Sequence, residues 1–412
     1  MSSGTQSAIS FNHLFPENTK NFLVPFRNIV VSDIQNGMNL NFDLVEKPRK
    51  KKISPILVLA TPEDAEAIVD IYFDIYNGTY PYKEMEDVKE VRQMIESDEF
   101  EWLLFKNEEG DILGCFTYEL DFFKRMGYMR GFNIKKKYQG KVDVVKACIG
   151  SMIAIWTQYK DKIDIWYCEN RTAHSNSQYI ANVCGIKPLA FLPNKDIFLN
   201  KKESVLLQVA YSIAALENLR TLNQPKIINS VSFCYSYSNE VYNLGKAIIS
   251  NPNIKLNLSK ISQLMHLLRI NINNMKFDSE KIKLSFEGFK SYFEFKHNKN
   301  SHNFEKVSYK VNSIEELFVF INEFKYLAKI KEVEYMECLI SAYLPEHQKL
   351  FFKLGFKPMG YLPSWEYNNQ TQKLEDRILF NLHVSPVLSE VHLINEAKRL
   401  LEKLEMTNIK IR

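Results

Sequence analysis

The feature that most constrains the fold of this chain is a short pattern that occurs twice. Gln178 begins the segment QYIANVCGIKPLAFLP, and Gln348 begins the segment QKLFFKLGFKPMGYLP. The two segments share Gln, Gly, Lys, Pro, Leu and Pro at the same offsets. In each segment a helix pattern ends at a glycine, and a strand pattern follows the glycine. Glycine is the residue most often found just after the end of a helix. Since duplication explains six matches at fixed spacing better than chance does, the chain is predicted to hold two copies of one unit.

The elements that precede each repeated segment follow a similar order. The first copy is predicted as β, α, α, β, β, β, α, β, α, β, beginning with a strand at Ile56–Leu59. In the second copy the strands resume near Lys281 and are followed by a helix at Ser313–Ala328. Between the copies, Ser204–Leu219 is predicted as a helix. This order is typical of an α+β fold with a mixed sheet.

Chain length agrees with a duplicated unit. At 412 residues the chain is too long for one ordinary core, and the length favours two domains. We predict an N-terminal arm at residues 1–52, a first domain at 53–200 and a second domain at 201–412. The arm ends in the basic run Lys47–Lys52. We expect this run to be a solvated linker, the alternative being a nucleic-acid or targeting patch.

Composition narrows the classes of function. A net charge of +4 permits an anionic ligand but lacks the strong basic excess of a nucleic-acid-binding domain. The six cysteines are scattered without a CxxC pair, which favours a reduced, cytoplasmic protein with core thiols over disulfides or a zinc site. The histidines show no metal-ligand spacing, and no apolar run is long enough to span a membrane. We therefore expect neither a metal nor a membrane partner.

A lysine-rich loop marks the most probable ligand site. The loop Lys135–Lys141 follows a strand pattern at Tyr128–Ile134 and leads into a helix pattern at about Val142–Tyr159. The first amides of a helix have no partner within it, and together with the helix dipole they favour an anion. The four lysines of the loop add positive charge. The stretch therefore predicts a site for a phosphorylated cofactor.

These motifs resemble those of the GCN5-related N-acetyltransferase (GNAT) superfamily, over about residues 54–200 and in weaker form over the later half. Tyr128–Ile134 resembles the splayed strand of the family, and Lys137-Tyr138-Gln139-Gly140-Lys141 resembles the lead-in of its motif A. Gly185-Ile186 and Gly355-Phe356 resemble its closing glycine. The resemblance implies two tandem acyl-CoA N-acyltransferase-like domains, each a mixed, mostly antiparallel sheet flanked by helices.

The resemblance also implies that acetyl-CoA or another acyl-CoA is the co-substrate. The residues that it implies for binding are Ile134, Lys136, Gln139, Gly140, Lys141, Val142 and Val144. The two valines stand where the family uses glycine to let the backbone approach a phosphate closely. At the position of the family's frequent general acid, a tyrosine, this chain has Ala181 in the first copy and Phe351 in the second.

Three residues are candidates for proton transfer. Glu169 and His174 lie near the end of the strand pattern Ile163–Cys168, and Tyr179 lies on the helix pattern that follows. A carboxylate or imidazole can take the proton of an acceptor amine, and a tyrosine can return one to a leaving thiolate. The alternative is that Glu169 and His174 only cap the helix and that Tyr179 packs in the core. Glu119, on a hairpin strand, is a further candidate base.

The leading hypothesis is an acyl-CoA-dependent N-acyltransferase that acts on a small-molecule or peptide amine. In the second copy, Ser313 and Glu316 form a capping-box pattern that satisfies helix amides internally, so we expect this copy not to bind the cofactor. One alternative is a non-catalytic, GNAT-like ligand-sensing or interaction protein. Another is a tandem transferase that uses an aminoacyl-tRNA donor.

Overall fold

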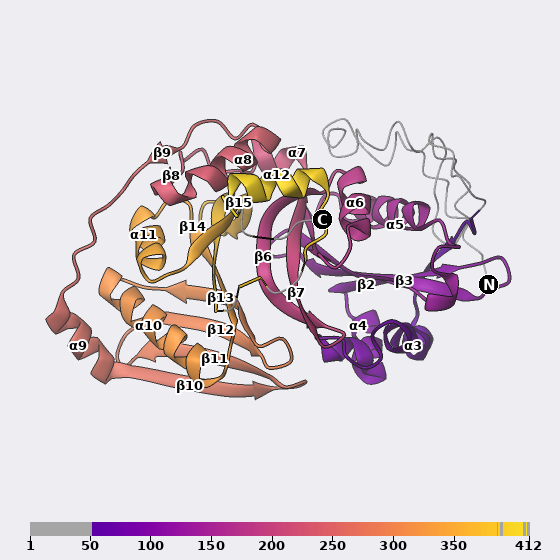
Figure 1. Ribbon diagram of the computed structural model, residues 1–412, viewed down its shortest axis with the longest axis horizontal. Coiled ribbons are helices and arrows are strands. Elements are labelled where there is room, and N and C mark those ends of the chain that lie inside the picture. Colours follow the sequence, from indigo (N-terminus) through magenta and orange to yellow (C-terminus); the bar gives the residue numbers. More distant parts are fainter. Residues whose placement is uncertain (1–51, 385, 388–389, 407–408, 410–412) are drawn as a thin grey trace. The chain divides into compact units, whose positions relative to one another are not determined.

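The computed structural model describes residues 52–384, 386–387, 390–406 and 409 (Figure 1). Apart from Lys52, the predicted N-terminal arm lies outside these residues. The chain divides into two compact units. Unit 1 comprises Met1–Asn170, Asn176–Lys187 and Gln208–Asn218, and unit 2 comprises Arg171–Ser175, Pro188–Leu207 and Leu219–Arg412.

The chain therefore enters unit 2 and returns to unit 1 twice, and from Leu219 onward it belongs to unit 2. Nearly all of β6 (Lys187–Phe198) and the first part of β7 (Lys201–Tyr211) belong to unit 2. The predicted domain boundary at residue 200 lies in the turn between these two strands. The last four residues of β7, Gln208–Tyr211, belong to unit 1.

Unit 1 follows the element order expected from its sequence. Its main elements are β1 (Ile56–Leu59), α3 (Ala65–Tyr76), α4 (Val88–Glu96), β2 (Phe100–Lys106), β3 (Ile112–Asp121), β4 (Met126–Ile134), α5 (Val144–Gln158), β5 (Ile165–Arg171) and α6 (Asn176–Val183). The strand order is β1-β2-β3-β4-β5-β7, in which the β4–β5 pair is parallel and the pairs from β1 to β4 are antiparallel. A 3-10 helix, η3 (Lys83–Glu86), precedes α4, and another, η4 (Lys136–Tyr138), follows β4.

Helices cover both faces of the unit 1 sheet (Figure 1). On one side lie α3 and α4, and α4 begins at a cap that its sequence provides: the Asp87 carboxylate accepts hydrogen bonds from the amides of Lys89 and Glu90 at 2.9 and 3.0 Å. On the other side, α5 and α6 enclose an apolar core in which the rings of Trp156 and Trp166 stack 5.7 Å apart. The α3 side of the sheet is more polar, and the candidate site lies there.

Unit 2 is built on the same plan. Its main elements are β6, the first part of β7, α8 (Ser232–Tyr242), α9 (Leu258–Leu267), β10 (Leu268–Met275), β11 (Ser279–Phe286), β12 (Tyr292–Asn298), β13 (Asn303–Lys310), α10 (Ile314–Ile330), β14 (Tyr335–Ser341), α11 (Pro345–Lys353), β15 (Lys357–Asn368), β16 (Lys373–His383) and α12 (Asn395–Lys403). The strand order is β6-β15-β16-β14-β13-β12-β11-β10, with only the β13–β14 pair parallel. Each unit thus holds a mixed, mostly antiparallel sheet flanked by helices, which confirms the predicted α+β class.

The predicted helix at Ser204–Leu219 is wrong. Residues 201–211 form strand β7, and only Ile213–Glu217 is helical. Every residue from Glu203 to Tyr211 is buried, so the strand is covered on both faces. A strand buried on both faces has a continuous apolar sequence, which periodicity alone does not distinguish from a buried helix.

The predicted cap of the second copy is present. The Ser313 hydroxyl accepts a hydrogen bond from the Glu316 amide at 3.4 Å. The Glu316 carboxylate, only 2% exposed, accepts hydrogen bonds from the Asn312 amide and the Ser291 hydroxyl, each at 2.7 Å. A buried carboxylate at the start of α10 opposes an anion there.

All six cysteines are buried free thiols, as expected from their scattered positions. None of the helices in the described part of the chain is both long and apolar enough to cross a membrane.

Candidate functional site

The site in unit 1 is organised by two strands that separate. Strands β4 and β5 are paired only from Met126 to Tyr128, with Tyr128 opposite Tyr167 as the last pair. Beyond this point, Met129–Ile134 of β4 runs outside the pairing with β5. An unpaired strand edge presents backbone N–H and C=O groups to a further extended partner. The opening therefore provides a place where a chain bearing amides can bind as an added strand.

A β-bulge distorts β4 beside this opening. Cys115 pairs with Asn133 and Thr117 pairs with Arg130, so two residues of β4, Gly131 and Phe132, lie opposite one residue of β3. Gly131 has a φ of +67°, which favours glycine. Bulges turn the strand and redirect its groups. The bulge in β4 places the side chains of Arg130 and Asn133 on the same face of the sheet. Arg130 contacts Glu119, and Asn133 contacts Tyr76 of α3.

Replacing Gly131 with alanine is expected to destabilise unit 1 by about 1–3 kcal/mol. The added Cβ would lie 2.0 Å from the Tyr72 hydroxyl oxygen, and the positive φ would be strained as well. Chemical denaturation followed by Trp102, Trp156 and Trp166, the tryptophans of unit 1, measures the effect.

The clash has a matched control. Tyr72→Phe removes only the hydroxyl, which is fully buried and has no hydrogen-bond partner among the described residues, so it should cost little alone. In the double variant it should restore part of the stability lost in Gly131→Ala. A double variant no more stable than Gly131→Ala would show that the Tyr72 contact is not the cause.

Acidic and aromatic side chains gather on the α3 side of the opening. Tyr128 and Tyr167 stack with ring centroids 4.7 Å apart. Glu169 lies two residues beyond Tyr167, on the same face of β5. Burial, and then the negative charge of Glu169, raise the pKa of Tyr128 well above its usual value. Glu169 and Tyr128 thus interact electrostatically near the point where β4 and β5 separate.

Arg130 lies at the centre of this group. It is 10% exposed, and its guanidinium lies 5.8 Å from the centroid of the Tyr128 ring and 5.9 Å from that of Tyr82. Nearby carboxylates belong to Glu84 at 3.7 Å and Glu119 at 3.8 Å. Burial alone would lower the pKa of Arg130, but these carboxylates raise it, so the group is always charged. Neither carboxylate is at the short distance of a charge-assisted hydrogen bond.

Several buried polar atoms around the bulge have no hydrogen-bond partner among the described residues. They are the Tyr72 and Thr117 hydroxyls, the Asn133 side-chain nitrogen and the Arg130 Nε. Tyr72 and Thr117 are fully buried, and both oxygens lie within 4 Å of the position that a Cβ on Gly131 would occupy. Buried polar groups are normally hydrogen-bonded, and such exceptions often mark a functional site. We count this cluster as part of the candidate site.

The predicted cofactor loop lies at the other end of β4. The Ile134 carbonyl ends the strand and accepts a hydrogen bond from the Gln139 side chain at 3.1 Å. The Lys136 amide donates to the Asp74 carboxylate of α3 at 2.6 Å. Gly140 is exposed with a φ of +75°, and no heavy atom lies within 4 Å of the position of an added Cβ. Lys136, Lys141 and Gly140 thus face solvent, where a phosphate can reach them.

The start of α5 is already occupied by protein groups. The Asp143 carboxylate, 7% exposed, caps the helix by accepting from the Lys146 amide at 3.1 Å. Val142 is buried, and its neighbours are bonded to Ile53: the Ile53 amide donates to the Lys141 carbonyl at 2.8 Å, and the Asp143 amide donates to the Ile53 carbonyl at 3.0 Å. These contacts, together with Val144 as the first helical residue, do not fit a diphosphate bound tightly on the helix amides.

The three residues predicted for proton transfer lie in different places. Glu169 is at the strand opening, as described above. Tyr179 lies on α6 and is 53% exposed, so it does not pack in the core. His174 is exposed in the segment Arg171–Ser175, which belongs to unit 2, whereas Glu169 and Tyr179 belong to unit 1.

Sequence reasoning missed most of the cluster on the α3 side. Arg130, Tyr128 and Glu84 were not singled out, and Glu119 was only a further candidate. A signal was available, because Tyr128 and Arg130 stand two apart in a strand pattern, as do Thr117 and Glu119. Polar residues at alternate positions of two adjacent, largely apolar strands predict a polar patch on one face of the sheet.

Comparisons with known proteins found distant similarities among solved structures. No protein-family model matches the sequence, and no curated protein does. The structure is similar to spermidine N-acetyltransferase SpeG from Vibrio cholerae in complex with CoA and spermine, with 12% identity, a TM-score of 0.33, and coverage of 38% of this chain and 95% of that chain. It is also similar to a dodecameric structure of that enzyme, with 12% identity, a TM-score of 0.33, and coverage of 40% and 96%. Unit 1 has the order of helices and strands that was predicted from its sequence.

Proposed function

We propose that unit 1 is an N-acyltransferase that moves an acyl group from an acyl-CoA to an amine. The observation that carries the proposal is the separation of β4 from β5 after Tyr128, with Glu169 and Arg130 beside the opening. The pantetheine arm of coenzyme A contains two amides. It suits the free edge of β4 because an extended chain can pair with a strand edge through backbone hydrogen bonds.

In this proposal the phosphates bind at the exposed end of the loop. Asp143 and Ile53 already satisfy amides at the start of α5, so the phosphates would contact Lys136, Lys141 and the Gly140 backbone instead. Exposed lysines attract a phosphate mainly as point charges. We expect weaker, more salt-sensitive coenzyme A binding than a glycine-rich helix start would provide.

The acceptor is proposed to be a protonated amine. Glu84, Glu119 and Glu169 carry three negative charges near the opening, and Arg130 balances only one of them. The faces of Tyr128 and Tyr82 already accommodate the Arg130 cation. Carboxylates and aromatic faces together attract ammonium groups. The net negative charge of this cluster therefore favours an amine over an anionic acceptor.

Glu169 is proposed as the base. It takes a proton from the ammonium group, the amine nitrogen then bonds to the thioester carbonyl carbon, and the carbon–sulfur bond breaks as the sulfur leaves as a thiolate. Backbone N–H groups of β4 at the bulge would polarise the carbonyl oxygen. A tyrosine donates its proton to the thiolate and is reprotonated by the second proton that the nitrogen loses as the amide forms. The candidates are Tyr179, proposed from the sequence, and Tyr128 at the opening.

Calorimetry with acetyl-CoA, followed by a free-thiol assay with a panel of primary amines, tests the proposal. We expect binding that Lys136→Ala with Lys141→Ala weakens, whereas Lys89→Ala on α4, also exposed, leaves it unchanged. Absence of acetyl-CoA binding at millimolar concentration would overturn the proposal.

A second candidate function is a ligand-sensing protein without catalysis, which the Asp143 carboxylate at the start of α5 favours. Binding of acetyl-CoA without thiol release for any amine would support it against the enzyme. Salt-dependent binding of aminoacyl-tRNA in place of acetyl-CoA would support the tRNA-dependent transferase instead.

A further inference from the structure

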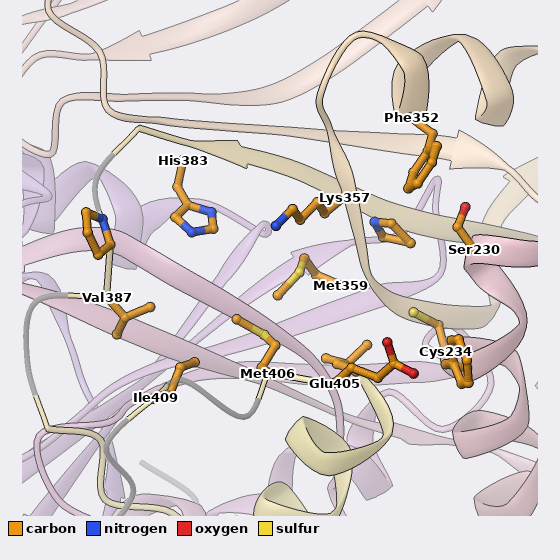
Figure 2. A pocket seen from close by; sticks show the side chains of 14 residues that line it. Ser230, Cys234, Phe352, Lys357, Met359, His383, Val387, Glu405, Met406 and Ile409 are labelled. Carbon is orange, nitrogen blue, oxygen red and sulfur yellow. The ribbon is translucent and has the colours of Figure 1, made fainter.

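Unit 2 contains a cavity of about 550 Å³ that the proposed function does not use (Figure 2). It is lined by Ser230 and the start of α8, by Phe352 near the end of α11, by the first residues of β15, by His383 at the end of β16, and by residues that follow β16 and α12. Its volume lies within the range of small-molecule sites. All of its lining residues belong to unit 2, so the inference is independent of the site in unit 1.

Most of the wall is apolar. Cys234 and Met359 are almost completely buried at 1% and 2% exposure and form its inner part. Phe233 and Phe352 also line the cavity but are 44% and 41% exposed. Large apolar side chains left in water lose the free energy that burial would provide, about 25 cal/mol per Å². An apolar occupant would cover these rings.

Positive charge lies at one end of the cavity. Lys357, the first residue of β15, is exposed and has no hydrogen-bond or ion-pair partner within the described part of the chain. The pKa of His383 is lowered mainly by burial and to a smaller extent by the positive charge of Lys357. An effect of this charge on His383 indicates that the two side chains are near each other. Figure 2 shows the ammonium end of Lys357 directed toward the His383 ring, whereas the Glu405 carboxylate lies nearer Cys234.

Two polar groups in this part of unit 2 have no hydrogen-bond partner among the described residues, and one of them lines the cavity. Asn381 lies directly opposite Lys357 in the β15–β16 pair, is fully buried, and has no hydrogen-bond partner among the described residues for either amide atom. The buried Ser230 hydroxyl, on the cavity wall, also lacks a partner there. Such groups are costly unless a ligand or water satisfies them. The cavity wall thus combines apolar side chains with one polar group, the Ser230 hydroxyl, that a ligand could satisfy.

We propose that this cavity binds a medium-chain carboxylate, with its carboxylate at Lys357 and His383 and its alkyl chain against Met359 and the two phenyl rings. An ammonium group without an internal partner favours an anionic head, and the lining of Phe and Met side chains favours an unbranched apolar tail. Glu405 disfavours a second negative charge at the far end, so a monocarboxylate fits better than a dicarboxylate.

Calorimetry of the full chain with decanoate, decanol and decanedioate tests the proposal. We expect decanoate to bind at least about tenfold more tightly than decanol, because only the carboxylate pairs with Lys357. Decanedioate should bind more weakly than decanoate. Lys357→Met should weaken decanoate binding about 10- to 100-fold and leave decanol binding nearly unchanged.

The matched control is Lys353→Met, which removes an exposed lysine of α11 that does not line the cavity. It should bind decanoate as the unmodified chain does. No decanoate binding to the unmodified chain, equal binding of decanoate and decanol, or unchanged decanoate affinity in Lys357→Met would each overturn the proposal. The decanol comparison uses no variant, so it stands even if Lys357→Met disturbs folding.

Discussion

Replacing Glu169 with glutamine is expected to lower kcat for acyl transfer about 10²- to 10⁴-fold, the usual contribution of a positioned general base. Glutamine keeps the size of the side chain but cannot accept the ammonium proton. Acetyl-CoA binding should change little, because the donor contacts proposed for β4 and the lysine loop do not involve Glu169. Steady-state thiol release together with calorimetry measures both quantities.

Glu119→Gln is the matched control for Glu169→Gln. Glu119→Gln also removes one negative charge from the cluster. The Glu119 carboxylate lies 3.8 Å from the Arg130 guanidinium, but Glu119 is on β3 and not at the strand opening. It should raise KM for the amine and leave kcat within a few-fold of the unmodified enzyme. If Glu119→Gln lowers kcat as much as Glu169→Gln does, the cluster acts only through its charge and Glu169 is not the base.

Replacing Arg220 with methionine is expected to destabilise unit 2 by about 3–5 kcal/mol, because it leaves a buried carboxylate without its counter-charge. Asp376 is fully buried, and its two oxygens accept from Arg220 Nε at 2.9 Å and from the terminal guanidinium nitrogen at 2.6 Å. The Ser364 amide and the Tyr361 hydroxyl donate to the same carboxylate. Hydrogen exchange of β15 and β16 peptides over a urea series measures the loss.

Arg399→Met is the matched control for Arg220→Met. Arg399 is 63% exposed and pairs with Glu240 at 2.6 Å, and Lys403 pairs with the same carboxylate at 2.7 Å. Exposed ion pairs contribute about 0–1 kcal/mol, so this variant should hardly change the stability. Similar losses in both variants would show that burial of Asp376 does not determine the cost.

The sequence predicted the class of fold because the fold depends on patterns that repeat. The Gly-x-Lys-Pro segments at Gly185 and Gly355, and the order of elements around them, are enough to identify two α+β copies. Strand β7 was missed because burial on both faces removes the alternation by which strands are recognised. The two chain segments that cross between the units were not predictable from local patterns, since they depend on pairing between residues far apart in sequence.

The site was only partly predictable, for a related reason. Glu169 was predicted because it lies at the end of a strand pattern, and the lysine loop because its charges are close together in the sequence; both stay predictions. Tyr128 and Arg130 lie two residues apart on β4, but Glu84 comes from η3, so the cluster forms only when η3 lies beside β4. Asp143 caps α5, but in the sequence it stands between Val142 and Val144, where the capping position depends on which residue begins the helix.

The passage of Pro188–Leu207 into unit 2 has a consequence for synthesis of the chain. Strand β6 pairs with β15 through Ala190 and Gly360, where an added Cβ on Gly360 would lie 2.4 Å from the Ala190 Cβ. The ribosome releases β6 long before β15 exists, whereas domains usually fold as contiguous stretches in order of synthesis. Unit 2 therefore cannot be completed from its own contiguous stretch, and an expression fragment that begins at residue 201 would lack one of its strands.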